Sequence, residues 1–307
     1  MKKILTFLFF LSVALGASAQ SAPALLIGSD PAAYARGGAA VALPASAFAV
    51  DNNASAMSLA EDSFSVAATY GMWAPKSADN MVVGLGAWYR IGEKFAVGLS
   101  GRMLRDKPYD ITTVGGQVTG SFTPSDLVVG LGLSYAFTDF LSVGLAARML
   151  SSKIGESMSG SSFAGDLTVS YAQNGVSAAL GVCNVGSPLS YGGASYALPM
   201  YAKLGGAYSI AGFTAGAEVD YLFSGALMAG LGLEYTIADI VSLRGGFHYG
   251  DAAKAIPTYA SLGLGVKFAG VHLDAAFLLA SKTLGTSVTT TSFPSIATKS
   301  KTIRSSS

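Results

Sequence analysis

The side chains that could perform catalysis are few, and their spacing does not suit it. The chain has two histidines, His248 and His272, and neither stands at the spacing of a metal-binding motif or of a catalytic triad. We expect His248 to be a hydrogen-bonding residue inside the fold. Cys183 is the single cysteine, so it cannot form an internal disulfide, and we expect it to be a small buried side chain. The sequence therefore predicts no enzyme and no catalytic, cofactor-binding or metal site.

Two short motifs are also weak evidence for a binding or modification site. Gly-x-Gly recurs along the chain, but no helix is expected to follow it and no Lys-Ser/Thr pair completes a phosphate-binding loop. Asn53-Ala-Ser55 matches a glycosylation acceptor, which is a weak three-residue signal. The formal net charge is only +1 and charged residues make up 12% of the chain, so no nucleic-acid partner is expected.

The amino-terminal residues resemble an export signal. Lys2 and Lys3 precede an apolar stretch at 4–16 that is too short to span a bilayer, and the small residues 17–19 form a cleavage site. We therefore expect residues 1–19 to be a cleaved signal peptide. After it, no apolar run is long enough for a transmembrane helix, although 51% of the chain is hydrophobic.

The chain is strongly apolar and yet has no expected transmembrane helix. An alternation with a period of two explains this, because successive side chains of a strand point to opposite faces. In 127–137, one parity carries Leu131, Leu133 and other large apolar residues, and the other carries Gly130 and Gly132. A soluble sandwich would have Lys, Glu and Thr on its outer face instead of Gly, Ala and Ser. We therefore predict an all-β transmembrane antiparallel barrel whose large residues face lipid and lipopolysaccharide. On this basis Leu131→Arg should impair assembly, whereas Gly132→Ser should be tolerated.

The charged residues of the strands support the same assignment of faces. A charge on the lipid face near the bilayer midplane costs about 2–4 kcal/mol. Eleven charged residues lie on the parity opposite the large apolar set, and we expect them to form ion pairs in the lumen: Arg90, Arg102, Arg148, Asp166, Lys203, Glu218, Asp220, Glu234, Arg244, Lys267 and Asp274.

Alternation predicts about fourteen strands in the barrel domain, 64–293. The expected strands are 64–73, 80–91, 95–104, 126–137, 140–150, 163–173, 175–185, 200–210, 212–223, 226–237, 240–249, 258–268, 271–281 and 284–293. Tight turns alternate with longer loops at 105–125, 151–162, 186–199 and 250–257, so both chain ends should lie on the periplasmic side. If the barrel does not end at Phe293, the count becomes thirteen plus an undetected strand near 45–55. With the barrel ending at Phe293, residues 294–307 are expected to be a polar carboxyl-terminal tail.

The residues between the signal and the first strand, 20–63, do not alternate. They are rich in Ala and carry few charges, which is unlike a disordered segment. They are either a flexible leader or an ordered segment inside the lumen, and we favour the second because glycine-lined walls leave room for it.

Part of this segment resembles the amino-terminal signature of the PorV/PorQ family. The matching stretches are DPAAYARGGAAVAL at 30–43, ASAF at 45–48, NNAS at 52–55, FSVAATY at 64–70 and WAP at 73–75. Asp30, Gly37, Gly38 and Asn53 are the hatch residues of this motif. Arg36 precedes Gly37 where Met is usual, and Asn53-Ala-Ser replaces Asn-Pro-Ala.

The resemblance implies a FadL-like outer-membrane barrel, plugged by its amino-terminal segment, in a Gram-negative bacterium. It implies a non-enzymatic accessory of type IX protein secretion that binds secreted cargo or surface attachment proteins through its outer loops. The loop tip Lys107-Pro108-Tyr109 is the candidate contact, although an ordinary solvated loop explains it equally well. The alternative is a FadL-type channel for a hydrophobic small molecule, which enters between outer loops and leaves through a gap in the wall.

Overall fold

The computed structural model describes residues 22–73, 80–251, 255–280, 288–292 and 295–299. The expected signal peptide at 1–19 lies outside these residues. No helix in these ranges is long and apolar enough to span a bilayer.

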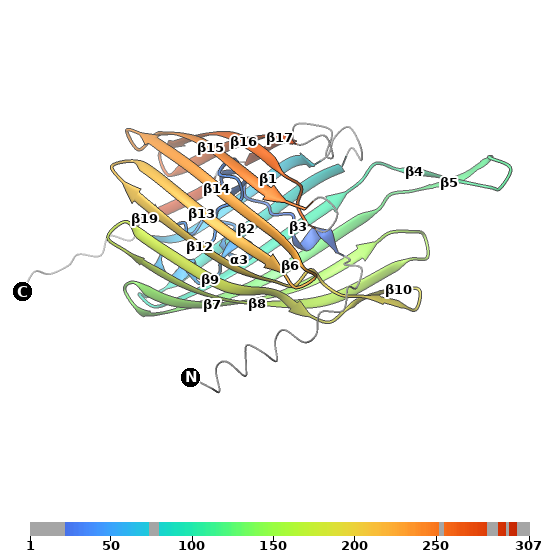
Figure 1. The fold of residues 1–307 in the computed structure, drawn as a ribbon, viewed down its shortest axis with the longest axis horizontal. Helices are drawn as coiled ribbons and strands as arrows, with labels where there is room; N and C mark the ends of the chain where they lie inside the picture. Colours follow the sequence, from blue (N-terminus) through green and yellow to red (C-terminus); the bar gives the residue numbers. More distant parts are fainter. Residues whose placement is uncertain (1–21, 74–79, 252–254, 281–287, 293–294, 300–307) are drawn as a thin grey trace, which may run out of the picture.

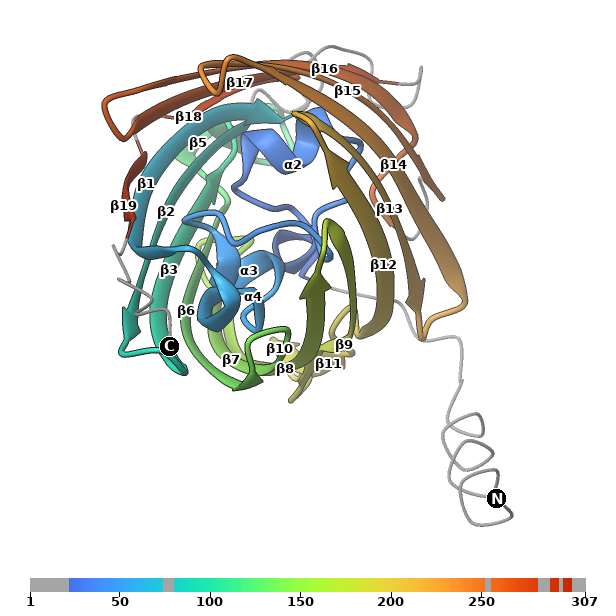
Figure 2. The ribbon, with the colours of Figure 1, turned by 90° about the vertical axis from the view of Figure 1, so that its left-hand side faces the viewer.

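Most of the described chain forms one large antiparallel β-sheet rolled into a barrel (Figures 1 and 2). Its fifteen strands are β1 (Asp62–Trp73), β2 (Asn80–Ile91), β3 (Phe95–Arg105), β6 (Ser125–Thr138), β7 (Leu141–Lys153), β8 (Ser159–Gln173), β9 (Val176–Gly186), β12 (Tyr201–Ile210), β13 (Phe213–Leu222), β14 (Ala226–Ile237), β15 (Val241–Gly250), β16 (Tyr259–Phe268), β17 (Val271–Ala280), β18 (Val288–Ser292) and β19 (Ser295–Lys299). Each barrel strand pairs with the next barrel strand along the chain, and the connections are tight turns at one end of the barrel and longer loops at the other. Asn174 and Gly175, for example, have φ of 52° and 79°, which suits a two-residue hairpin turn.

The last position of the barrel corrects the expected carboxyl end. Both β18 and β19 pair with β17 on one side and with β1 on the other, so they share one position between these strands. The fifteen strands therefore occupy fourteen positions, and pairing continues around the barrel from β1 to β1. Pairing with β1 reaches Lys299 of β19, which lies opposite Asp62, so the barrel does not end at 293. Alternation is weak in this part of the chain, so the sequence did not mark where the pairing ends.

The two faces of the wall carry the side chains that alternation predicted. Leu131 and Leu133 on β6 are 50% and 40% exposed, whereas Val128 on the opposite parity is 1% exposed. The same pattern of exposed large apolar residues continues around the barrel, as expected for a surface in contact with lipid.

The amino-terminal segment lies inside the barrel (Figure 2). We call residues 22–61 the plug; it contains η1 (Pro23–Leu25), α2 (Pro31–Ala35), α3 (Ala49–Asn52) and α4 (Ala56–Leu59). Asp30 caps α2 by accepting a hydrogen bond from Ala33 N at 3.2 Å, and Pro31 takes the first helical position, where its missing N–H costs nothing. The expectation of an ordered lumenal segment is confirmed. The alternative of a strand near 45–55 is wrong, because α3 occupies that stretch.

The two ends of the barrel differ in their connections. At the turn end the strands are joined by short turns such as 174–175 and 269–270. At the loop end, 105–125 contains β4 (Tyr109–Thr112) and β5 (Val118–Phe122), a two-stranded ribbon that projects beyond the barrel (Figure 1). A smaller ribbon there contains β10 (Leu189–Tyr191) and β11 (Ala194–Tyr196).

Candidate functional site

The lumenal glycines make room for the plug. A Cβ atom at Gly132 of β6 would lie 2.9 Å from Val50 Cγ2 and 3.2 Å from Met57 Cε, closer than side chains normally pack. A Cβ at Gly98 of β3 would lie 2.6 Å from the same Val50 methyl group. The plug therefore packs directly against the wall, and the repeated glycines of the strands mark this contact.

One ion-pair network joins the plug to three strands. Asp51 of α3 pairs with Arg102 of β3, with 3.1 Å between Oδ2 and Nη1, and its Oδ1 lies 3.7 Å from Nε of Arg148 on β7. Arg148 also pairs with Asp166 of β8. All four side chains are at most 5% exposed. Because removing one partner of a buried pair leaves the other charge uncompensated, this network fixes α3 in the lumen.

A second network lies nearer the turn end. Arg36 of the plug pairs with Glu234 of β14 at 2.7 Å, and Glu234 also pairs with Arg244 of β15. Arg244 in turn pairs with Asp274 of β17. The plug residue is therefore held by a chain of alternating charges that three strands of the wall supply.

The other lumenal charges have individual places. Glu218 accepts hydrogen bonds from the backbone N–H groups of Ala40 and Val41, both at 2.7 Å. The Nζ of Lys203 donates to the Asn52 carbonyl, and Arg90 donates to the Ala60 carbonyl. Lys267 is exposed and, with His272, lines an open polar hollow of about 380 Å³ at the turn end.

The four hatch residues do not meet at a single point. Asp30 accepts hydrogen bonds from Ser46 Oγ at 2.7 Å and Asn52 Nδ2 at 3.0 Å, so it closes the plug on itself. Asn53 donates to Ser170 of β8 at 2.8 Å. Gly37 and Gly38 take φ of 65° and 81°, which favour glycine.

The double glycine turn is pressed against the wall. Gly37 N donates to Ser261 Oγ at 3.2 Å, and its carbonyl lies 3.2 Å from Nδ1 of His248. This contact gives His248 the lumenal hydrogen bond that the sequence suggested. Among the described residues, no group of three or more His, Cys, Asp and Glu side chains is arranged to hold a metal ion.

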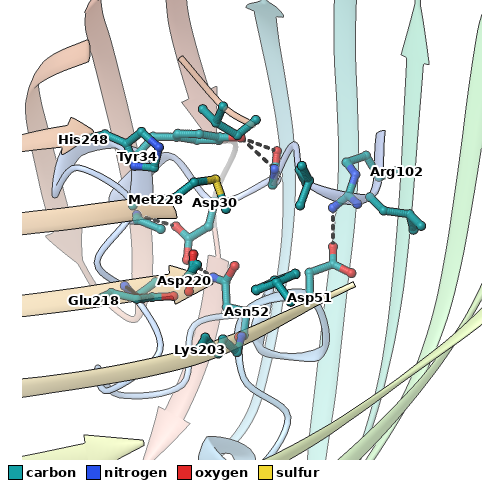
Figure 3. A pocket seen from close by; sticks show the side chains of 18 of the residues that line it. Asp30, Tyr34, Asp51, Asn52, Arg102, Lys203, Glu218, Asp220, Met228 and His248 are labelled. Carbon is teal, nitrogen blue, oxygen red and sulfur yellow. Dashed lines mark hydrogen bonds and ion pairs between the residues drawn. The ribbon is translucent and has the colours of Figure 1, made fainter. Parts of the chain in front are cut away.

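A cavity of about 110 Å³ lies between the plug and the wall (Figure 3). Part of its lining is apolar or aromatic: Leu25, Leu26, Tyr34, Met228, Ile256 and Tyr259. Burial raises the pKa of Tyr34 in the plug to about 12, so its phenol stays neutral. The rest of the lining carries charged groups, including Asp51, Arg102, Lys203, Glu218 and Asp220. The cavity therefore has an apolar part and an ionisable part.

Sequence reasoning missed the plug side of this site. The described part of the plug has four charged residues, Asp30, Arg36, Asp51 and Glu61. Because an unpaired buried charge is costly, the few charges of this segment could have been predicted to form pairs. The aromatic lining from Tyr34 and Tyr259 had no comparable signal, because it depends on the path of the plug.

The candidate partner loop needs one correction. Lys107, Pro108 and Tyr109 are exposed, but they do not form the tip of the loop. Tyr109 begins β4 and pairs with Phe122 at the base of the ribbon. The tip is the turn in which Thr113 N donates to the Gln117 carbonyl at 2.9 Å. Residues 109–112 lie between the barrel and this tip because their β-propensity favours a strand.

The barrel, its lumenal plug and the lipid-facing wall define the class of protein: a FadL-like transmembrane β-barrel. Solved structures with this fold include the Ralstonia pickettii toluene transporter TbuX, with a TM-score of 0.63 and 14% identity over 89% of this chain and 97% of that one. The CymD monoaromatic hydrocarbon channel has a TM-score of 0.63 and 13% identity over 90% and 99%. A Pseudomonas aeruginosa FadL homologue has a TM-score of 0.59 and 12% identity over 88% and 98%.

These likenesses at 12–14% identity show a shared fold. No family model matches the sequence, and no curated protein matches it.

Proposed function

We propose that this protein is an outer-membrane channel for a small hydrophobic molecule. The observation that carries the proposal is the partly apolar cavity of about 110 Å³ between plug and wall. Structures with the same fold are described as a toluene transporter and a monoaromatic hydrocarbon channel, which supports this reading. The turn end, with its short connections, would face the periplasm.

An apolar path leads to the cavity from the loop end. Leu25, Ile27 and Tyr34 of the plug belong to one buried cluster with Trp73 at the end of β1 and Leu104 near the end of β3. The rings of Tyr34 and Trp73 lie 5.5 Å apart. Because Leu25 and Tyr34 also line the cavity, a ligand that separates the loop-end contacts remains in apolar surroundings as it moves inward.

The outer face of the wall is hollowed beside the glycine turn of the plug. On the lipid face of β12 to β15, small residues such as Gly206, Ala217 and Gly245 leave an apolar depression of about 730 Å³. On the inner face, a Cβ at Gly232 or Gly246 would collide with Arg36 or Gly37. Because several outer positions here carry small side chains and the plug touches the inner face, this stretch is our candidate for release of the ligand into the membrane.

The test compares toluene uptake by bacterial cells that make the full chain with uptake by cells that lack it. Gly28 lines the cavity, and a Cβ there would lie 3.7 Å from Tyr34 Oη, an ordinary contact. Gly28→Phe should therefore fill the cavity and return uptake to the level of cells without the protein. Gly101→Phe is the matched control, because a Cβ at Gly101 has no atom within 4 Å.

Two results would contradict the proposal. One is an uptake rate that the protein does not raise. The other is full uptake through Gly28→Phe when its amount in the outer membrane equals that of the Gly101→Phe protein.

The type IX accessory role and the PorV/PorQ assignment stay predictions from the resemblance of 30–55. The ribbon β4–β5 is the part of the structure that such a protein partner would meet first (Figure 1). The comparisons favour the small-molecule alternative, since the similar structures are described as transporters and channels.

A further inference from the structure

The ionisable part of the cavity has more carboxylates than arginine and lysine side chains, and it also contains the imidazole of His248. Its lining includes the carboxylates of Asp30, Asp51, Glu218 and Asp220, and the cations of Arg102, Arg148 and Lys203. Arg148 is also paired with Asp166, which lies behind the lining. With these carboxylates and cations ionised and the imidazole neutral, the site therefore has a formal negative charge.

The cations are already engaged with the protein. Arg102 uses Nη1 for Asp51 and Nη2 for the Ala24 carbonyl, at 3.1 and 2.8 Å. Arg148 pairs with Asp166 and also donates from Nη1 to Asn184 Oδ1 at 3.0 Å. Lys203 donates to the Asn52 carbonyl. An anionic ligand such as a carboxylate would have to displace these contacts.

Asp220 differs from the other carboxylates of the lining. Asp30, Asp51 and Glu218 each accept hydrogen bonds from the plug or the wall. The Oδ1 atom of Asp220 is buried and has no hydrogen-bond partner among the residues that the structure describes. Figure 3 shows Asp220 beside Glu218, Asn52 and Lys203 at the cavity. A buried carboxylate oxygen without a donor is a natural acceptor for a ligand that brings one.

Apolar groups lie next to this acceptor. Met228 of β14 is the direct cross-strand partner of Asp220 on β13, and both line the cavity. The neutral rings of Tyr34 and Tyr259, 6.4 Å apart, complete this side. Aromatic faces attract cations as well as apolar groups. A ligand with an apolar body and a positively charged head group would thus have complementary surroundings for both parts within one cavity.

We propose that the cavity binds a small aromatic or alkyl amine, with its ammonium group at Asp220 and its apolar body against Met228 and the tyrosines. This inference rests on the proposed function and names the substrate class of the same site. The volume of about 110 Å³ is of the order of the roughly 150 Å³ cavity that admits benzene in another protein. The ligand is therefore a molecule of about one ring in size.

The test uses four probes that share one ring and differ in the head group: toluene, benzyl alcohol, benzylamine and benzoate. Binding to the full chain in detergent is measured by calorimetry at neutral pH. Because a hydrogen bond to a charged group contributes about 1.5–3 kcal/mol, benzylamine should bind at least about tenfold more tightly than toluene. Benzoate should bind most weakly of the four.

Two variants test the assignment of the head group. Asp220→Asn should reduce the preference for benzylamine over toluene to about threefold or less, because the charge is lost. Asp110→Asn removes a carboxylate from the exposed ribbon strand β4 and should keep the full preference. If Asp220→Asn does not fold, the order of the four probes on the unmodified protein decides alone.

The outcomes separate this inference from the proposed function. Toluene binding with no advantage for benzylamine, or benzoate as the tightest probe, would overturn the amine assignment and leave the channel proposal standing. Failure of all four probes to bind would count against both.

Discussion

Asp51 of the plug lies between two arginines of the wall, 3.1 Å from Nη1 of Arg102 and 3.7 Å from Nε of Arg148. One carboxylate thereby joins α3 to β3 and β7, which are far from it in sequence. All three side chains are at most 4% exposed, so solvent screens the contacts little.

Asp51→Asn should loosen the plug without opening the barrel. The change leaves two buried guanidinium groups with less compensation, and we expect a loss of about 3–5 kcal/mol in the stability of the docked plug. Hydrogen exchange should show faster exchange at 22–61 and unchanged exchange in the strands distant from α3. Asp110→Asn on the exposed ribbon is the control; equal protection of the plug in both variants would refute the role of Asp51.

Gly37→Ala tests the contact between plug and wall separately from backbone strain. Gly37 and Gly92 both have φ of 65°, so alanine should cost about 1–2 kcal/mol at either position. At Gly37 the added Cβ also meets backbone atoms of Phe247 and Leu231, whereas at Gly92 nothing lies within 4 Å. The thermal unfolding temperature should therefore fall further for Gly37→Ala than for Gly92→Ala. Equal shifts would mean that the turn is not pressed against β14 and β15.

Gly132→Ser, which alternation alone predicted to be harmless, should destabilise the protein. A Cβ there would lie 2.9 Å from Val50 Cγ2 of the plug, and overpacking of this kind costs about 1–3 kcal/mol. Val50→Ala should restore part of the loss in the double variant, which a double-mutant cycle measures. Gly101→Ser, on the open outer side, serves as the control. Strict additivity of the two changes would argue against contact.

Leu131→Arg should impair insertion of the barrel into the membrane. Leu131 is 50% exposed on the lipid face of β6, and an arginine near the membrane midplane costs about 2–4 kcal/mol. The folded fraction is read from the heat-dependent mobility of the barrel in gels. Gly115→Arg in the ribbon β4–β5 adds the same charge outside the barrel, at a position with ordinary contacts, and should leave that fraction unchanged. If both variants fold equally, the assignment of faces is wrong.

Alkaline pH should release the plug through Tyr34. Burial raises its pKa from an ordinary value near 10 to about 12. A pKa that is higher in the folded state means that this contribution to stability is complete below pH 10 and is lost as pH rises towards 12. The difference in hydrogen exchange of the plug between the unmodified protein and Tyr34→Phe should therefore depend on pH in this window. An unchanged difference would show that Tyr34 is not buried.

The strands were predictable because the membrane imposes a simple rule on them. β2 at 80–91 and β14 at 226–237 have the bounds that alternation gave, since lipid requires large apolar residues at every second position. The end of the last strand was not predictable in the same way. Alternation is weak there, and only the pairing of β19 with β1 shows that the barrel extends to Lys299.

The site was predictable only on its wall side. Parity placed Arg148 and Glu218 in the lumen, but it carried no information on their partners. Those partners lie in the plug: Asp51 for Arg148, and the backbone of Ala40 and Val41 for Glu218. The plug has no periodic pattern, so its path follows from contacts with strands far along the chain. The position of Tyr109 at the base of a ribbon likewise depends on pairing with Phe122.

The fastening of the glycine turn to β16 sets an order on biogenesis. Ser261 binds the carbonyl of Ala35 across 226 residues and the amide of Gly37 across 224. The plug is synthesised first, but Ser261, which holds its glycine turn, is synthesised only after most of the chain. A chain that stalls before β16 would therefore lack this contact, although the Asp51 network could already hold α3, and fixing the glycine turn against the wall becomes one of the final events of assembly.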